Sequence, residues 1–501
     1  MLLKRSSGIL LHPTSFPGRF GVGDLGESAY RFIDFLAESG QQVWQILPLG
    51  PTGYGNSPYL CYSAFAGNPL LINLEWLASE GLLSEEDFAN LPDFSPERVD
   101  YDRAIALKMP LLQKACDNFR AGGSPERHEE FEAFRTTHAY WLQDYALFMT
   151  LKEAHNGASW QDWEPALRDR DRDTLKEWSD RLEDRVYFHE YVQSEFFRQW
   201  QTLKRYANDK GVQIFGDVPI YVAADSADVW SDPKIFVLNV KTGKPAMMAG
   251  VPPDYFSETG QLWGNPVYNW QYLERTHFKW WIQRVEGMLD YVDIIRIDHF
   301  RGLEAFWAVP GWAKVATKGQ WVKAKGDAFF EALEAELGKL PIVAEDLGVI
   351  TPEVDALREK YEIPGMKVLQ FAFDSDSGNG FLPFNYFDRN CIVYTGTHDN
   401  DTTVGWFYAR SHDQQQRVID YLGCLCEDGI HWSLIRLALS CVANCAIIPL
   451  QDVLGFGNDA RMNLPGTAQG NWSWRYRAED LKPEWCDRLK YLTSIYGRAP
   501  Y

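Results

Sequence analysis

The chain has 501 residues, of which 46% are apolar, 24% charged and 15% aromatic, so a disordered chain is excluded. Asp and Glu outnumber Lys and Arg by 69 to 49, which gives a formal charge of −20. We therefore expect no nucleic acid partner, because a protein that binds the phosphate backbone needs a basic face. This length suits three domains or one large α/β barrel that carries insertions.

The N-terminus has basic residues, but only Ile9–Leu11 follow them before His12 and Pro13, which is too short for the apolar region of a signal peptide. No apolar run approaches the ~20 residues of a membrane helix, so we expect no membrane partner. The eight cysteines include no C-x-x-C pair. Buried free thiols are the better interpretation, and we expect a cytoplasmic protein.

Short apolar runs recur along the chain, and most are separated by segments typical of helices, such as Ser28–Ser39, Ala328–Leu337 and Thr351–Lys360. The eight runs are Gly8–Leu11, Val43–Leu47, Gln213–Asp217, Asp293–Asp298, Pro341–Glu345, Met366–Phe371, Cys391–Tyr394 and Cys445–Leu450. Buried strands that alternate with helices predict an α/β fold, a (β/α)8 TIM barrel.

The connection between the second and third runs, from Leu47 to Gln213, is far longer than one barrel helix requires. It is charged and rich in helix-forming residues, for example over Arg168–Arg185 and Glu190–Tyr206. We expect a mainly helical insertion over residues 76–208, packed on a single catalytic barrel unit that spans residues 1–501.

Four of the eight runs end at or near a carboxylate: Asp217, Asp298, Glu345 and, after a short turn, Asp399. Active sites of barrels lie at the C-terminal ends of the strands, so these four side chains are expected on one rim. One such carboxylate could serve an ion pair or a helix cap, but four converging carboxylates favour a site, because a charge near an apolar core is costly unless it is paired or used.

The neighbours of these residues suggest different roles. Arg296 shares a strand face with Asp298 and is expected to hold it ionised, as a nucleophile requires. Glu345 is expected in the barrel mouth, where apolar walls and another carboxylate raise its pKa, which suits a general acid. Asp399 has His398 beside it. These are the groups needed to cleave a glycosidic bond.

Aromatic residues near this rim favour a sugar substrate. Tyr54 and Tyr59 lie on a loop expected after the second strand, and two further clusters, residues 254–257 and 262–265, are expected in a loop before the fourth. Amphipathic rings beside Asn, Asp and Gln suit the flat faces and hydroxyl edges of glucose.

Other motifs carry less weight. Gly21–Gly26 matches G-x-G-x-x-G, but the preceding residues 13–20 contain two prolines and cannot form the strand that a dinucleotide site requires. The histidines show no zinc spacing, and there is no Walker loop or G-x-S-x-G motif. We expect no cofactor and no metal.

Together these blocks make the chain recognisable: it resembles the amylomaltase or disproportionating-enzyme family, the 4-α-glucanotransferases of the α-amylase clan. The resemblance runs from Arg5–Thr14 to Gly470–Arg475. Its most specific blocks are Tyr54–Tyr59, Gly216–Val222, Arg296–Gly302, Ala344–Gly348 and Thr397–Asp401.

The resemblance implies a role for each candidate residue. Asp298 would be the nucleophile, Glu345 the acid/base and Asp399 the stabiliser of the transition state. Arg296 and His398 would support them. The residues implied to contact substrate are Asp217, Tyr59 on the donor side, Tyr54 and Tyr101 in a remote glucan-binding groove, and Tyr255, Phe256, Trp263 and Asn265 in a lid loop over residues 250–265.

The implied reaction is retaining transfer of an α-1,4-glucan segment to the 4-hydroxyl of another glucan or glucose, through a covalent glucosyl-enzyme intermediate. The expected partners are maltooligosaccharides and α-1,4-glucans, with no obligate protein partner evident. Two alternatives stay open: an α-1,4-glucan hydrolase, in which water reaches the intermediate, and a non-catalytic glucan-binding barrel. Three converging carboxylates argue against the second.

Overall fold

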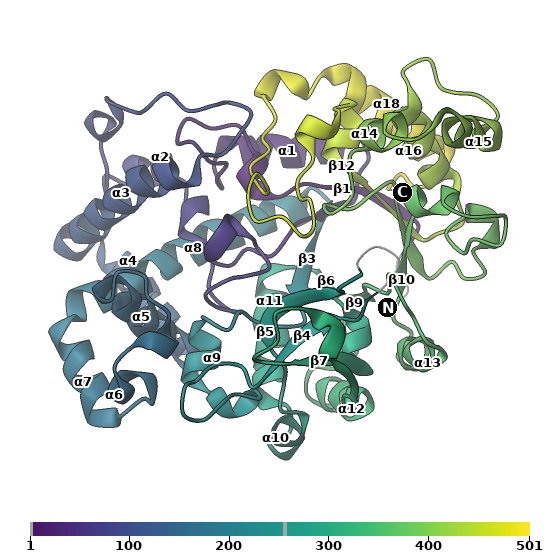
Figure 1. Ribbon diagram of the computed structural model, residues 1–501. Coiled ribbons are helices and arrows are strands. Elements are labelled where there is room, and N and C mark those ends of the chain that lie inside the picture. Colours follow the sequence, from purple (N-terminus) through teal and green to yellow (C-terminus); the bar gives the residue numbers. More distant parts are fainter. Residues whose placement is uncertain (1–3, 254–257, 501) are drawn as a thin grey trace.

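The computed structural model describes residues 4–253 and 258–500, and at its centre is a sheet of eight parallel strands (Figure 1). In spatial order the strands are β10 (Gly365–Val368), β11 (Cys391–Tyr394), β12 (Cys445–Pro449), β1 (Ser6–Leu10), β2 (Val43–Gln45), β3 (Gln213–Pro219), β6 (Ile294–Asp298) and β9 (Ile342–Ala344). The backbone N–H of Ala344 donates to the carbonyl of Pro364 at 2.8 Å, which brings the two ends of the sheet together. The predicted (β/α)8 barrel is confirmed.

The strands form from continuous apolar runs because both of their faces are buried. In β11, Ile392 and Tyr394 belong to a cluster in which residues from most of the barrel strands meet, whereas Val393 packs in the layer beneath the helices. Side chains that alternate in this way fill the inside of the barrel and also seal its outside. Each of the eight predicted runs contains a barrel strand, although the sixth continues after Val368 into a 3-10 helix, Leu369–Phe373.

Strand β1 lies between β2 and β12, so the first and last barrel strands are neighbours. The buried guanidinium of Arg498 joins them: it donates to the carbonyl of Ser6 at 2.8 Å and to that of Asn444 at 3.1 Å. The two ends of the chain are therefore held together on this side of the barrel.

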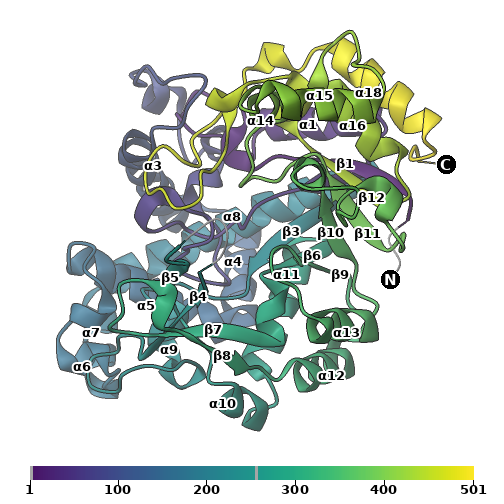
Figure 2. The ribbon, with the colours of Figure 1, turned by 45° about the vertical axis from the view of Figure 1, so that its right-hand side comes forward.

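Helices cover the outside of the barrel (Figures 1 and 2). The three predicted helical segments correspond to α1 (Glu27–Glu38), α12 (Gly326–Leu337) and α13 (Pro352–Lys360). The others outside the long connection are α9 (Ala227–Ser231), α10 (Trp270–Arg275), α11 (Lys279–Tyr291), α14 (Thr403–Tyr408), α15 (His412–Leu422), α16 (Ile430–Ser440), α17 (Leu450–Leu454) and α18 (Pro483–Ile495). Over the described ranges, no helix combines the length and the apolar character needed to cross a membrane.

The long connection between β2 and β3 carries its own group of helices, on the left in Figure 1. They are α2 (Leu74–Ser79), α3 (Tyr101–Gly122), α4 (Pro125–Thr137), α5 (Ala139–Ala154), α6 (Pro165–Arg168), α7 (Arg172–Arg181) and α8 (Glu183–Asp209). The side-chain amides of Gln193 and Gln199 on α8 each bond both the N–H and the carbonyl of one residue, Gly67 and Asn73 respectively, at 2.7–3.2 Å. The division of the chain into a barrel unit and an insertion stays a prediction.

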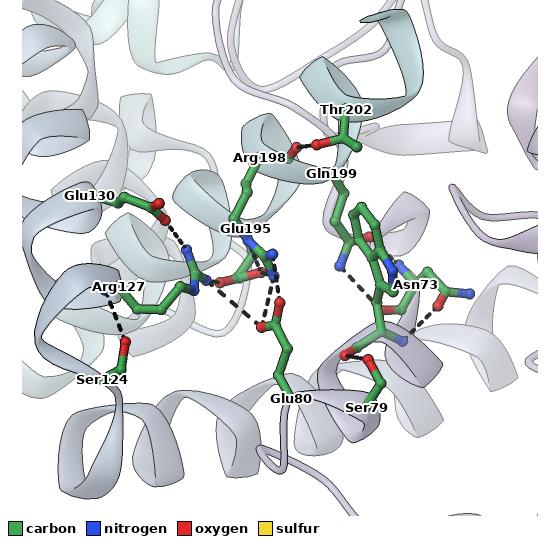
Figure 3. Close-up of polar contacts among 11 residues, drawn as sticks. Asn73, Ser79, Glu80, Ser124, Arg127, Glu130, Glu195, Arg198, Gln199 and Thr202 are labelled. Carbon is green, nitrogen blue, oxygen red and sulfur yellow. Dashed lines mark hydrogen bonds and ion pairs between the residues drawn. The ribbon is translucent and has the colours of Figure 1, made fainter. Parts of the chain in front are cut away.

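A buried carboxylate connects α8 to α4 and to the end of α2 (Figure 3). Glu195 accepts from Arg127 and, at 2.6 Å, from Arg198, whose guanidinium also bonds Glu80 at 2.6 Å. A buried charge is tolerated where such partners neutralise it. These ion pairs fix the helices of the connection to one another.

A second, four-stranded antiparallel sheet was not predicted. Its order is β5 (Gln261–Pro266), β4 (Met247–Val251), β7 (Ala305–Pro310) and β8 (Gln320–Lys323). The expectation of a loop over residues 250–265 is therefore wrong at both ends, which are the strands β4 and β5. Met and Gly in β4 and Gly and Pro in β5 hide these strands from sequence analysis, because such residues are not typical of strands.

Candidate active site

The four predicted carboxylates lie at the C-terminal ends of barrel strands. Asp217 lies in β3, Asp298 is the last residue of β6, Glu345 directly follows β9, and Asp399 is in the loop after β11. Strands β3, β6 and β9 are consecutive in the sheet. The structure therefore brings these groups to one rim, as the sequence predicts.

Arg296 connects two of these carboxylates. Its Nη1 lies 2.6 Å from Asp217 Oδ2 and 3.0 Å from Asp298 Oδ1. The hydroxyl of Tyr59 donates to Asp217 Oδ2 at 2.7 Å. Arg296 and Asp217 are both buried, so their pairing neutralises two charges beneath the rim.

Glu345 is held by backbone groups rather than by a cation. Its two carboxylate oxygens accept from the N–H of His299 at 2.8 Å and of Leu347 at 2.9 Å. His299 has a φ of 55°, a conformation uncommon for a residue with a side chain, and it turns the chain sharply after Asp298. Burial raises the pKa of Glu345, and the negative charge of Asp298 raises it further.

The contact of Arg296 with Asp298 is confirmed, and Arg296 favours the ionised form of Asp298, but other effects outweigh it. Burial raises the pKa of Asp298 and outweighs the opposing effect of Arg296, and Asp217 and Asp399 raise it further. Asp298 has a cation at 3.0 Å, whereas the donors to Glu345 among the described residues are neutral N–H groups. The contact with Arg296 therefore favours the ionised form of Asp298.

Asp399 lies half exposed on the opposite side of the rim, with 48% of its side chain accessible. Asn463 Nδ2 donates to its Oδ1 at 2.7 Å, and Arg461 donates to its backbone carbonyl at 2.6 Å. His398 Nε2 lies 3.4 Å from the same Oδ1, and burial lowers the pKa of this imidazole. Sequence analysis missed Asn463 and Arg461, because a loop far along the chain gives no strand pattern to mark them.

An aromatic stack borders Asp217 and Asp399. The ring of Tyr59 is stacked on His398, with centroids 5.1 Å apart, and Trp472 lies 5.8 Å from Tyr59. Trp472 is a further residue that sequence analysis missed. Its carbonyl accepts from the hydroxyl of Tyr101 at 2.7 Å.

Tyr101 is only 8% exposed, so its ring offers little surface to a glucan. The structure thus gives it a position behind Trp472 rather than in an open groove. Tyr54 begins a short 3-10 turn, Tyr54–Asn56, on the loop after β2.

The residues expected in the lid loop separate into three groups. Trp263, on β5, lies edge-on to the ring of His299, with centroids 4.8 Å apart, and so reaches the rim. Asn265 is buried and donates to the carbonyl of Val222 at 2.8 Å, so it holds a loop rather than facing the site. Tyr255 and Phe256 lie outside the described residues.

Within the described residues, no group of three or more His, Cys, Asp or Glu side chains could hold a metal ion. Gly21–Gly26 follows a short 3-10 turn, Pro13–Ser15, instead of a strand. The geometry that a dinucleotide loop requires is thus not met there.

Comparison with known proteins decides the family. The family model described as 4-alpha-glucanotransferase matches residues 11–481. The chain belongs to the 4-alpha-glucanotransferase family. A 4-alpha-glucanotransferase of Synechocystis is 60% identical over 502 residues, covering 100% of this chain and 99% of the relative, and that of Thermus thermophilus is 50% identical, covering 99% and 100%.

A solved structure agrees with this assignment. The amylomaltase of Streptococcus agalactiae, in complex with acarbose, is 41% identical, with a TM-score of 0.96 and coverage of 99% of this chain and 100% of that one. The family resemblance and the expected enzyme class, a 4-alpha-glucanotransferase, are confirmed.

Proposed function

We propose that this 4-alpha-glucanotransferase cleaves an α-1,4-glucan with Asp298 as nucleophile and Glu345 as acid/base, and transfers the released segment to the 4-hydroxyl of another glucan or of glucose. One observation carries the assignment of roles. The pKa of both carboxyl groups is raised, but Asp298 has a cation at 3.0 Å that favours its charge, whereas the described groups that bond Glu345 are neutral N–H donors. Neighbouring carboxyl groups in different surroundings, one beside a cation and one beside neutral donors, suit this chemistry.

In the first step, Asp298 attacks the anomeric carbon while Glu345 protonates the leaving oxygen, giving a covalent β-glucosyl-enzyme. In the second step, Glu345 takes the proton of the incoming 4-hydroxyl, which displaces Asp298 and restores the α-linkage. Glu345 thus gives one proton to the leaving sugar and regains one from the acceptor. Two inversions leave the anomeric configuration unchanged.

The remaining groups of the rim act on the donor sugar. Asp399, fixed by Asn463 at 2.7 Å, is proposed to bind sugar hydroxyls as positive charge develops on the ring. The stacked rings of Tyr59 and His398 form an apolar wall beside it, and Asp217 with Arg296 supports the nucleophile from below. We propose that Tyr54 binds glucan further from the cleavage point.

Transfer requires that a sugar, rather than water, meets the intermediate. Trp263 lies beside His299, next to the nucleophile, so it is suitably placed to bind an acceptor ring and exclude water. Tyr255 and Phe256 are proposed to act with it.

The free cysteines of the described residues fit the expected cytoplasmic location, which stays a prediction.

Incubation with maltotriose alone tests the reaction. Transfer gives glucose together with a ladder of longer maltooligosaccharides, whereas glucose and maltose with nothing longer indicate a hydrolase. Binding without any product indicates a non-catalytic barrel. In Asp298→Asn, turnover should be abolished while glucan binding is retained, and near-normal turnover in this variant would overturn the assignment of the nucleophile.

A further inference from the structure

The thioether of Met366 contacts the guanidinium that pairs with the proposed nucleophile. Arg296 Nε donates to Met366 Sδ at 3.4 Å, and both side chains are buried in the barrel. The Nη1 of the same guanidinium lies 3.0 Å from Asp298 Oδ1 and 2.6 Å from Asp217 Oδ2. Because a guanidinium is rigid and planar, an acceptor at Nε also restricts the direction of Nη1. The contact with Met366 therefore limits how Arg296 can turn relative to the two carboxylates.

The backbone of Met366 is held by the loop that carries the proposed acid/base. Its N–H donates at 2.7 Å to Oδ1 of Asp346, the residue that follows Glu345. Gly365 permits this close approach, because a Cβ at that position would lie 2.2 Å from Asp346 Oδ2. Strands β9 and β10 lie side by side where the barrel closes (Figure 2). Met366 is thus bonded through its main chain to the loop of one carboxyl group and through its side chain to the cation of the other.

The thioether of Met366 differs from other acceptors because it is neutral and only weakly polar. A carboxylate at this position would place a third negative charge beside Arg296 and raise the pKa of Asp298 further, as the neighbouring carboxylates already do. An aliphatic side chain would leave a buried N–H without a partner. The sulfur instead satisfies Nε and leaves the charge of Arg296 to its two carboxylates.

We propose that Met366 is a positioning residue of the transfer reaction, whose thioether orients Arg296 so that its Nη1 stays against Asp298. The alternative is that Met366 only fills space inside the barrel, as a leucine would. The two roles differ at Arg296 Nε, because only an acceptor holds that N–H. The positioning role rests on the proposed function of Asp298 as nucleophile, and Met366 itself contacts no substrate in it.

Met366→Leu tests this role, because it removes the acceptor with little change in volume. The quantity to measure is the acid limb of the pH profile of kcat/KM with maltotriose, which reports the ionisation of Asp298. A guanidinium released at Nε favours the charge of Asp298 less, so the limb should move to higher pH by about half a unit to one unit, with kcat about three- to tenfold lower. The KM should change little, because glucan does not contact Met366.

The charged and titratable groups around Asp298 are the same in this variant. They are Arg296, Asp217, Asp399, Glu345 and Tyr59. His299, next to Asp298 in the chain, is kept neutral, because burial lowers its pKa to about 3. A shift of the acid limb in Met366→Leu therefore reports the orientation of Arg296 rather than a change in the surrounding charges.

Two further variants separate hydrogen bonding from packing. Met366→Gln has a similar length and offers a neutral carbonyl oxygen to Arg296 Nε, so the acid limb should return most of the way to its wild-type position. Ile392→Leu is the matched control. Ile392 is the register partner of Met366 on β11 and belongs to the same interior cluster, but its side chain carries no acceptor. Ile392→Leu should leave the acid limb in place.

Three results would each overturn the positioning role. They are a wild-type acid limb in Met366→Leu, an equal shift in Ile392→Leu, and a shift in Met366→Gln as large as that in Met366→Leu. If Met366→Gln does not fold, the comparison of the two leucine variants decides.

Arg296→Gln and the wild-type enzyme separate failure of this role from failure of the proposed function. If the acid limb stays in place in Arg296→Gln, it does not report Asp298, and if wild type forms no ladder from maltotriose, the proposed transfer is wrong. In either case crystal structures of wild type and Met366→Leu decide on Met366. A displaced Arg296 guanidinium supports the positioning role, and an unmoved one overturns it.

Discussion

The backbone N–H of His299 lies 2.8 Å from a carboxylate oxygen of Glu345, so the residue that follows Asp298 also holds the second carboxylate. In return, the N–H of Phe300 donates to the backbone carbonyl of Glu345 at 3.1 Å. The ends of β6 and β9 are thus joined by side-chain and backbone bonds. The relative position of the two carboxyl groups is therefore set by the backbone, which is more rigid than a contact between side chains.

The acid role of Glu345 predicts a dependence on the leaving group. In Glu345→Gln, transfer from maltotriose should fall by about 10²–10⁴-fold, because no proton reaches the leaving sugar. Formation of the intermediate from α-maltosyl fluoride should fall much less, since fluoride leaves without protonation. Single-turnover kinetics with both donors measures this difference. Asp298→Asn is the control and should lose both reactions; equal losses in Glu345→Gln would contradict the acid role.

The raised pKa values predict a bell-shaped pH profile of kcat/KM. Glu345 must be protonated in the first step, so activity falls as pH rises through its raised pKa. Asp298 must be ionised, so activity falls as pH drops through its pKa, which is also raised above the usual range. The acid limb should therefore lie at a higher pH than for an exposed Asp, with its pKa of about 4.

Arg296 provides the test of that acid limb. Because Arg296 lowers the pKa of Asp298, Arg296→Gln should move the acid limb to higher pH as well as reduce the rate. Arg296→Lys keeps the charge and should move it less. An acid limb that stays in place in Arg296→Gln would show that the limb does not report Asp298.

Asn463 is predicted to be a positioning residue for Asp399. Asn463→Ala removes the 2.7 Å bond to Asp399 Oδ1, leaving the half-exposed carboxylate free to rotate. A hydrogen bond to a charged group is worth about 1.5–3 kcal/mol, so kcat should fall by about tenfold or more. Thermal unfolding should be little changed, since the site is at the surface. An unchanged kcat would remove Asn463 from the site.

Asp452 is predicted to anchor the loop that carries His398 and Asp399. It is 1% exposed and accepts from Thr395 Oγ1 at 2.6 Å, from Thr403 Oγ1 at 2.8 Å and from the Thr403 N–H at 2.7 Å. Asp452→Ala leaves these buried donors unsatisfied and should cost about 3 kcal/mol of unfolding free energy, with a lower kcat.

Denaturant unfolding measures the loss of unfolding free energy in Asp452→Ala, and steady-state kinetics measures the fall in kcat. Asp413→Ala, at an exposed position in the first turn of α15, is the control and should change neither quantity. Full stability in Asp452→Ala would show that the loop is held by other contacts.

We predict that removal of Glu195, which lies far from the rim, lowers the stability of the fold. Glu195→Ala leaves Arg127 and Arg198 without their buried partner, which should cost about 3–5 kcal/mol. Calorimetry detects this as a lower Tm. Exposed Glu130, which also pairs with Arg127, is the matched control, and Glu130→Ala should change Tm little. Equal effects of the two variants would contradict the importance of burial.

Sequence analysis succeeded where a local pattern of residues determines the secondary structure and the position of a side chain. An apolar run such as Asp293–Asp298 forms a barrel strand because both faces are buried, and its terminal carboxylate then lies on the rim. It failed where position depends on contacts between distant segments. Asn265 and Tyr101 have the residue types of a sugar site, yet one holds the carbonyl of Val222 and the other that of Trp472.

The site residues that sequence analysis missed were overlooked for a different reason. Asn463, Arg461 and Trp472 come from an irregular segment that follows the last barrel strand, and no periodic pattern marks such residues. Only the folded chain shows that this segment returns to Asp399 and Tyr59. The strands β4 and β5 were missed because their Gly, Met and Pro residues are atypical of strands, and their pairing with β7 is what orders them.

The pairing of β1 with β12 has a consequence for biosynthesis. β1 is the first barrel strand to leave the ribosome, and its neighbour on one side is not made until residues 445–449 are translated. Throughout elongation, one edge of β1 thus offers unpaired backbone groups to any other extended chain nearby. A ribosome that stalls after residue 399 but before residue 445 leaves a chain in which every catalytic carboxylate is present but the ring of strands cannot close, and such fragments should be prone to aggregation and dependent on chaperones.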